Sequence, residues 1–394
     1  MDATAADARR DTPLARLLLC AGLLWVAGVA LRITILAVPP LIRLIHDDLA
    51  LSETEVGILS GLPTALFACA AVPGSLLIAQ IGARTTLIAG MLVAALGCAL
   101  RGAAPDFALL CAATVVTGLG VALMQPALPP LVRDWLPDRI GFGSAVYTNG
   151  LLIGEILPIA LTAALVLPLL AQSWRLAFVF WALPYVVMIV LMLSFAPPAT
   201  SAAAAPRRWW PDWRSGLTWR LGLMFGANNA TYFTTNAFLP DYLHYVGQPD
   251  FINAALNALN IGQLPASLIL LAVAGRLIGR AWPYAACGAL SIACITGILV
   301  GHGWVIVAAA AALGFSGAVS LTLILALPPL LAAPEDVSRT TAAVFTISYS
   351  CAVIVPIVSG RIWDASGIPA SAFVPIAVSN FLLIGLAWGI PRRS

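Results

Sequence analysis

A single arginine, Arg32, lies near the middle of the first long apolar run of the chain, which extends from Leu17 to about Leu44. A helix needs about 20 apolar residues to cross a bilayer. A charged side chain at the centre of such a helix costs ~2.5–3.5 kcal/mol on insertion scales, so its presence needs a reason. We interpret Arg32 as the floor of a cavity that binds a solute.

The composition predicts a membrane protein with many spans. Charged residues make up 9% of the chain and hydrophobic residues 61%, whereas soluble domains are about 25% charged. The apolar stretches lack strict alternation, which favours helices over the strands of an outer-membrane barrel. We predict an all-α fold with twelve transmembrane helices, at about 17–41, 53–79, 85–103, 107–131, 141–170, 174–195, 217–240, 252–274, 281–300, 304–331, 340–360 and 369–390.

The basic residues predict the orientation of these spans. The chain contains no lysine, so its twenty basic residues are all arginines. Apart from Arg32, fifteen of them fall in segments predicted to be cytoplasmic, and only Arg43, Arg101, Arg175 and Arg361 fall outside. The positive-inside rule then places both termini in the cytoplasm. No basic cluster indicates nucleic-acid binding.

Several other classes of function find no support in the sequence. The seven cysteines lie in predicted helices without the spacing of metal ligands, so they are interpreted as small apolar residues. No stretch resembles a phosphate-binding loop, and the soluble segments are too short for an ATPase domain. We find no clustered nucleophile and base, and no metal ligands at depth. We therefore expect no cofactor, no metal and no enzyme activity, and a chain that acts as a monomer.

An internal repeat divides the chain. The sequence Ala127–Leu131 recurs as Ala326–Leu330, about half the chain later. Six helices in each copy give both halves the same orientation, which is the parallel-repeat design of transporters. We predict an N-terminal six-helix bundle over 1–195, a cytoplasmic linker over 196–215 and a C-terminal six-helix bundle over 216–394.

Twelve helices, a six-plus-six repeat, a central linker and short basic turns after helices two and eight resemble the major facilitator superfamily over essentially the whole chain. The superfamily signature after helix two is matched by Gly74, Gly82 and Arg84. Ile78 and Ala79 occupy the region of its acidic residue, so the chain departs from the family where a gating salt bridge usually forms. The resemblance implies an inner-membrane transporter that works by alternating access.

Within the superfamily, three stretches are similar to the group of cyanate permeases and 2-nitroimidazole transporters. These stretches are Leu31-Arg32 with Pro39-Pro40-Leu41, Ala99-Leu100-Arg101, and Gly118-Leu119-Gly120 leading through Gln125 to Pro129-Pro130. The resemblance implies a small, cyanate-like anion as the solute.

Polar groups deep in a span should face the protein interior or a water-filled cavity. Two ionised residues are this deep, Arg32 and Glu155, and the family resemblance implies that their helices are neighbours. We predict that Arg32 binds an anion and that Glu155 is either a proton-linked gate or a contact to the solute. A buried ion pair that merely joins the two helices is the structural alternative.

Neutral polar residues at helical spacing complete the predicted site. They come from both halves of the chain: Gln125, Tyr147, Asn228, Asn229, Tyr232, Asn257, Asn260 and Tyr349. A transmembrane asparagine is about as often a bond between helices as a ligand contact. The main prediction is a secondary transporter of a small anion or compact polar solute. The alternative is a proton-coupled exporter of neutral heteroaromatic compounds such as 2-nitroimidazoles.

Overall fold

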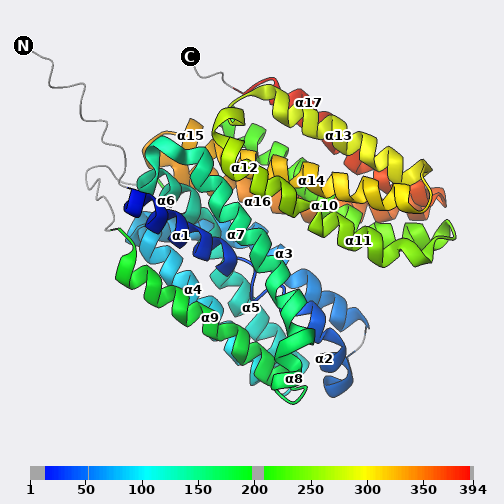
Figure 1. Cartoon of the computed structure of the whole chain (residues 1–394), viewed down its shortest axis with the longest axis horizontal. Coiled ribbons are helices and arrows are strands. Elements are labelled where there is room, and N and C mark those ends of the chain that lie inside the picture. Colours follow the sequence, from blue (N-terminus) through cyan, green and yellow to red (C-terminus); the bar gives the residue numbers. More distant parts are fainter. Residues whose placement is uncertain (1–13, 52, 198–207, 391–394) are drawn as a thin grey trace, which may run out of the picture.

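A computed structural model describes residues 14–51, 53–197 and 208–390, and within these ranges helices are joined by short turns, without a β-strand (Figure 1). The first half contains α1 (Leu14–Ala30), α2 (Ile42–Leu49), α3 (Glu53–Ile81), α4 (Ala83–Gly102), α5 (Phe107–Met124), α6 (Leu128–Trp135), α7 (Ile140–Leu161), α8 (Leu167–Leu169) and α9 (Trp174–Phe195). The second half contains α10 (Gly216–Tyr245), α11 (Ile252–Ile261), α12 (Gln263–Leu277), α13 (Ala281–Val300), α14 (Trp304–Leu325), α15 (Leu327–Leu331), α16 (Val337–Ser366) and α17 (Val374–Ala387).

The predicted all-α membrane fold is confirmed, because ten helical segments of the described chain are long and apolar enough to cross a membrane. They coincide with ten of the twelve predicted spans. The other two predicted spans correspond to α1, a shorter apolar helix, and to α10, a 30-residue helix that carries several amides and hydroxyls.

The helix of one predicted span ends earlier than expected, and a single turn residue interrupts the helix of another. The span predicted over 17–41 is helical only to Ala30, and residues 31–38 form a series of turns before a short 3₁₀ helix at Pro39–Leu41. The span predicted over 252–274 breaks at Gly262, between α11 and α12. Arg32 therefore lies on a non-helical stretch of chain, called here the unwound segment (residues 31–38).

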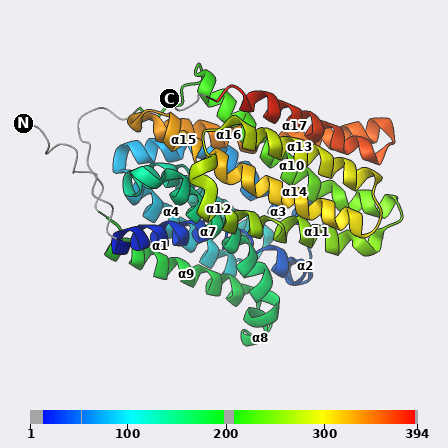
Figure 2. The same cartoon turned by 45° about the horizontal axis from the view of Figure 1, so that its top comes forward.

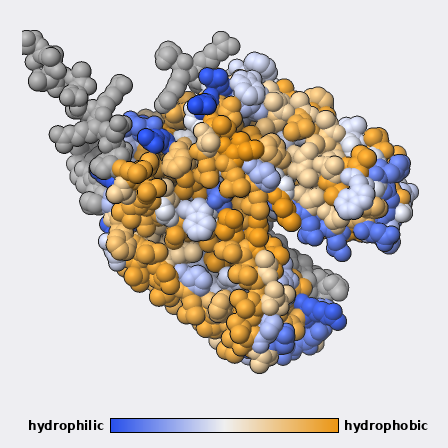
Figure 3. All heavy atoms as spheres, in the orientation of Figure 1, coloured by the Kyte–Doolittle hydropathy of each residue, from blue (hydrophilic) through white to orange (hydrophobic). Residues whose placement is uncertain are grey.

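The helices form two groups, α1 to α9 and α10 to α17, which are visible in both views (Figures 1 and 2). The groups meet at the end that carries α6 and α15 and diverge toward the end that carries α2, α8 and α11. The space-filling view shows a cleft between them at the diverging end and an outer surface made mostly of apolar side chains (Figure 3). Such a surface suits contact with lipid.

Polar contacts tie the chain together at the closed end. Arg133, in α6, donates from Nη1 to the carbonyl oxygen of Ala332 in the other half, at 2.7 Å. Arg84, in the family signature, donates to the carbonyl oxygens of Met192 and Leu193 at the end of α9. Arg84 therefore bonds main-chain carbonyls, since the turn after α3 lacks the acidic residue of the family signature.

Candidate functional site

Glycines bring α1 and α7 into backbone contact. A Cβ atom added to Gly28 of α1, or to Gly150 or Gly154 of α7, would collide with a backbone carbonyl of the other helix. Small residues at four-residue spacing permit this approach between membrane helices. The close packing of the two helices leaves Arg32, just past the end of α1, beside Glu155 on α7.

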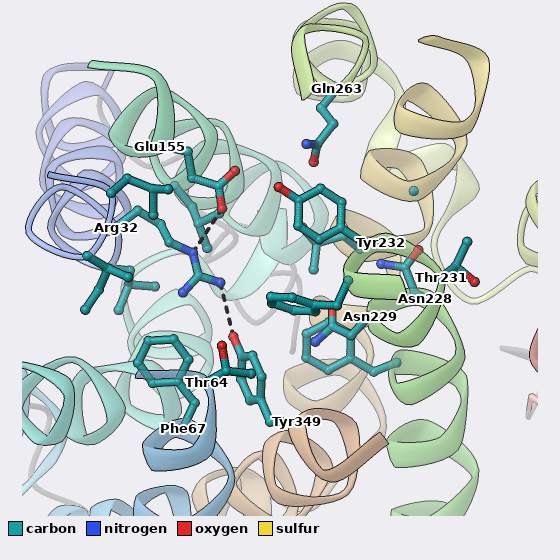
Figure 4. A pocket seen from close by; sticks show the side chains of 18 of the residues that line it. Arg32, Thr64, Phe67, Glu155, Asn228, Asn229, Thr231, Tyr232, Gln263 and Tyr349 are labelled. Atoms are coloured by element: carbon teal, nitrogen blue, oxygen red, sulfur yellow. Dashed lines mark hydrogen bonds and ion pairs between the residues drawn. The ribbon is translucent and has the colours of Figure 1, made fainter. Parts of the chain in front are cut away.

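Arg32 is held by groups from both halves of the chain (Figure 4). Its Nε donates to Oε1 of Glu155 at 3.0 Å, and its Nη2 donates to the hydroxyl of Tyr349, on α16, at 3.1 Å. The ring of Phe67 lies 5.4 Å from the guanidinium carbon and 5.1 Å from the ring of Tyr349. A carboxylate, a hydroxyl and an aromatic face therefore surround one cation, a setting that strengthens each contact away from bulk water.

These residues line a cavity of about 230 Å³ between the two groups of helices. A water molecule occupies ~30 Å³ in the liquid. The cavity therefore has room for a solute much larger than one or two water molecules. Among the described residues that line it, Arg32 and Glu155 are the only charged ones. The cavity thus offers one ion pair surrounded by hydroxyl, amide and aromatic groups.

Eight of the ten predicted site residues line this cavity: Arg32, Gln125, Tyr147, Glu155, Asn228, Asn229, Tyr232 and Tyr349. The side-chain nitrogen of Gln125 and the hydroxyl of Tyr147 are buried and find no hydrogen-bond partner within the described part of the chain. Buried polar atoms in this state are available to a solute or to water.

Two predicted site residues lie elsewhere. Asn257 is exposed on α11 and does not line the cavity. Asn260 accepts a hydrogen bond from the Tyr232 hydroxyl at 2.7 Å and donates to the Leu256 carbonyl at 2.8 Å. Tyr232 lines the cavity, and Asn260 does not. Asn260 instead holds the tyrosine in place through its hydrogen bond to the hydroxyl.

Several cavity residues were missed by the sequence interpretation. The missed polar ones include Thr64, Thr231, Ser291 and Asn380, and the missed aromatic ones include Phe67, Phe225 and Phe345. An aromatic ring inside an apolar span carries no sequence signal for its direction. Gln263, three positions after Asn260, also lines the cavity, where the turn at Gly262 interrupts the helix.

A buried arginine from another helix supports the unwound segment. Arg101, in the last turn of α4, was predicted to lie on the external side, and its side chain is fully buried within the protein. Its Nη1 donates to the carbonyl oxygen of Thr34 at 2.9 Å, its Nε donates to the Thr114 hydroxyl at 3.1 Å, and its guanidinium carbon lies 5.5 Å from the ring of Phe178. The side chain turns inward because it satisfies a carbonyl that the broken helix leaves without a helical partner.

Tyr185, on α9, makes a second contact to the same stretch. Its hydroxyl donates to the carbonyl oxygen of Ala30, the last residue of α1, and lies 3.2 Å from the Thr34 hydroxyl oxygen. Arg101 and Tyr185 therefore hold the back of the unwound segment, while Arg32 projects from it into the cavity.

Replacing Arg101 by Met should loosen the unwound segment. An unsatisfied buried carbonyl costs ~1–3 kcal/mol, which corresponds to ~5- to 150-fold faster amide exchange if the segment opens locally. Hydrogen–deuterium exchange of a peptide covering residues 28–38 measures this, with Arg361→Met, an exposed arginine on α16, as the control. Equal exchange in Arg101→Met and the unmodified protein would contradict the assigned support.

An exposed ion pair holds α2, the helix that follows the unwound segment. Arg175 donates from Nη1 to Oδ2 of Asp48, at 2.6 Å, and the indole nitrogen of Trp174 donates to the same oxygen. The hydrogen bond from Arg175 lowers the pKa of Asp48 below its ordinary value. The pair is exposed and contributes little to stability, but it joins α2, which follows the unwound segment, to the start of α9.

Comparisons with known proteins agree with this architecture. The family model described as Major Facilitator Superfamily matches residues 20–247. The cyanate transport protein CynX of Escherichia coli (strain K12) is 26% identical over 385 residues, which cover 93% of this chain and 96% of that protein. The 2-nitroimidazole transporter of the same organism is 29% identical over 252 residues, covering 62% of each chain.

A solved structure shares the fold. The E. coli fucose:proton symporter FucP, crystallised as a point variant, superposes with a TM-score of 0.74 at 14% identity, covering 97% of this chain and 99% of that one. At this identity the likeness concerns the fold alone. Taken with the family match over more than half of the sequence, it leads to one conclusion: the chain belongs to the major facilitator superfamily and is a membrane transporter, not an enzyme.

Proposed function

We propose that the protein is a secondary active transporter that moves a small anion, or a compact polar solute with an anionic group, across the bacterial inner membrane by alternating access. Arg32 binds the anionic group, and Glu155 carries a coupled proton. The observation that carries the proposal is the ion pair of Arg32 and Glu155 on the wall of a cavity shared by both halves.

The geometry of the pair explains how an anion and a proton are linked. A guanidinium has five N–H donors, and Arg32 uses one on Glu155 and one on Tyr349. An anion competes with the Glu155 carboxylate for the charge of Arg32. Protonation of Glu155 ends that competition, so the anion and the proton occupy the site together. The likeness to a protein named for cyanate transport supports a small anion as the solute.

The proposal includes a specific membrane topology. Twelve spans result if α1 with the unwound segment and α10 cross the membrane together with the ten apolar segments. Both termini are then cytoplasmic, and a six-helix bundle over 1–195 is joined by the linker 196–215 to a second over 216–394. The distribution of arginines supports this orientation. The cleft at the α2 end then faces outward, and one chain is sufficient for transport.

A second candidate function is proton-coupled export of neutral heteroaromatic compounds such as 2-nitroimidazoles. The cluster of rings at the cavity favours it: Tyr349 lies 6.0 Å from Phe345 in a stacked arrangement and 6.4 Å from Phe225. Aromatic walls bind planar rings by stacking. The partial likeness to the 2-nitroimidazole transporter also supports it.

A thermal-shift screen separates the two candidates. The purified protein is heated with sodium cyanate, other small anions or 2-nitroimidazole, in mildly acidic and in mildly alkaline buffer. Anion transport predicts that anions raise the melting temperature, and more so in acidic buffer, because a ligand that binds the folded state stabilises it. Stabilisation by 2-nitroimidazole alone would favour the second candidate and refute the first.

A further inference from the structure

The cavity has a second polar end, which lies in the C-terminal half. Asn228 and Thr231 of α10, Ser291 of α13 and Asn380 of α17 line it. In the close view Asn228 and Thr231 lie beyond Tyr232 from Arg32 (Figure 4). Among the described residues that line this end, none is charged. A solute that extends from Arg32 to this end therefore meets a cation at one side and neutral amides at the other.

Asn228 differs from the neighbouring amides in its hydrogen bonding. Asn229 donates to the Ser348 hydroxyl at 2.8 Å, and Asn380 donates to the Thr231 hydroxyl at 2.9 Å. The Asn228 amide makes no hydrogen bond to any described residue, and the residue as a whole is 9% exposed. Its amide atoms are not among the buried side-chain atoms that lack a partner, so they are accessible from the cavity that Asn228 lines. An amide that faces the cavity without a partner from the protein is available to a ligand or to water.

The space in front of Asn228 is open. A Cβ atom added to Gly317, on α14, would meet nothing within 4 Å except the Asn228 amide oxygen, at 3.8 Å. Both residues line the cavity. The missing side chain at Gly317 thus leaves room for a flat group next to the amide.

The chemistry of a free amide defines the group that fits it. Asparagine presents one acceptor oxygen and one donor nitrogen side by side. Its best complement is a planar group with an adjacent donor and acceptor, as in the paired contact that asparagine makes with adenine. Amides, ureides and azole rings with an N–H next to a ring nitrogen have such an edge, and cyanate does not.

We propose that Asn228 recognises an adjacent N–H and acceptor pair on the solute, so that the substrate class is a small planar anion with an amide-type or azole edge opposite its charged group. This inference rests on the proposed function, since Arg32 must bind the charged end. Phe225, one turn before Asn228 on α10, contacts Tyr349 and so continues an aromatic wall from the arginine to the amide.

Matched probes test the inference. Pyrazole-4-carboxylate has a carboxylate opposite an adjacent N–H and N, thiophene-3-carboxylate has a similar ring without them, and cyanate reaches only the Arg32 end. Dissociation constants are measured by calorimetry on the full chain in lipid nanodiscs. We expect pyrazole-4-carboxylate to bind about tenfold more tightly than thiophene-3-carboxylate, as one well-placed pair of hydrogen bonds provides.

The variants Asn228→Ala and Asn228→Leu should lose this tenfold preference and keep the affinity for thiophene-3-carboxylate, which also shows that they fold. The control is Asn257→Ala, an exposed asparagine of α11 that does not line the cavity. It should keep the preference. No preference in the unmodified protein, a preference that survives in Asn228→Ala, or no binding of either ring acid would overturn the inference.

The proposed function has a separate test. If Arg32→Gln abolishes cyanate binding while the two ring acids bind equally in the unmodified protein, anion binding stands and the role of Asn228 is refuted. If Arg32→Gln binds all three anions as the unmodified protein does, the proposed function itself fails.

Discussion

Replacing Arg32 by Gln should weaken the binding of small anions by at least ~30-fold. Removing one partner of a buried charge pair costs ~2–5 kcal/mol, and ~2 kcal/mol is already a factor of about 30 in a dissociation constant. Arg32 is the only cation among the described residues of the cavity wall, so no other side chain there takes over its charge. Uptake of a labelled anion into vesicles, together with the dissociation constant of the purified protein, measures the effect.

Two further variants make this experiment specific. Arg32→Gln leaves the Glu155 carboxylate without its partner, and that negative charge alone would repel an anion. The double variant Arg32→Gln with Glu155→Gln removes both charges, and we expect it to remain defective, because the anion has lost its cation. Recovery in the double variant would contradict direct binding by Arg32. Arg361→Gln, which removes an exposed arginine of α16, should bind and transport normally.

Replacing Glu155 by Gln should remove the pH dependence of anion binding. In the unmodified protein a proton on Glu155 ends its competition for Arg32, so the bound state takes up a proton and affinity rises as the pH falls. A one-proton linkage allows a change of up to about tenfold per pH unit. Gln keeps the shape of Glu without a titratable proton. The Glu155→Gln protein should therefore bind the anion with one affinity throughout, close to the acidic limit of the unmodified protein.

The transport rate supplies the second half of this test. If Glu155 carries the coupled proton, the Gln variant should exchange anions across vesicles yet fail to accumulate them against a gradient when a pH difference is imposed. The control is Asp241→Asn, an exposed carboxylate of α10. Proton-driven accumulation that persists in Glu155→Gln would refute the role of Glu155 as the proton carrier. The ion pair would then serve only to join the region after α1 to α7.

The positions of most spans followed from the sequence, because membrane helices are long apolar runs whose ends are marked by charge, glycine and proline. The unwound segment did not follow. Residues 31–38 contain neither glycine nor proline, and the break is held by Arg101 and Tyr185, which are distant in the chain. The burial of the Arg101 side chain did not follow either, because arginines at the end of an apolar run usually face water.

The candidate site was predictable in part for a related reason. Arg32 and Glu155 were conspicuous as charges inside apolar runs, and the family resemblance placed their helices together. The spacing of Asn257 and Asn260 indicated that they are close on one helix, but spacing does not say which neighbour a helix face meets. In the structure Tyr232 meets Asn260, and only contacts between distant segments determine that choice.

The hydrogen bond between Arg32 and Tyr349 joins the two halves of the molecule at the cavity. The tyrosine oxygen accepts from the arginine, so its own proton remains free to be donated. An anion at this point would receive an N–H from one bundle and an O–H from the other. Its presence would then lower the energy of every conformation in which the bundles stay close around it. A bound solute would thus add contacts between the two halves, and its release would remove those contacts.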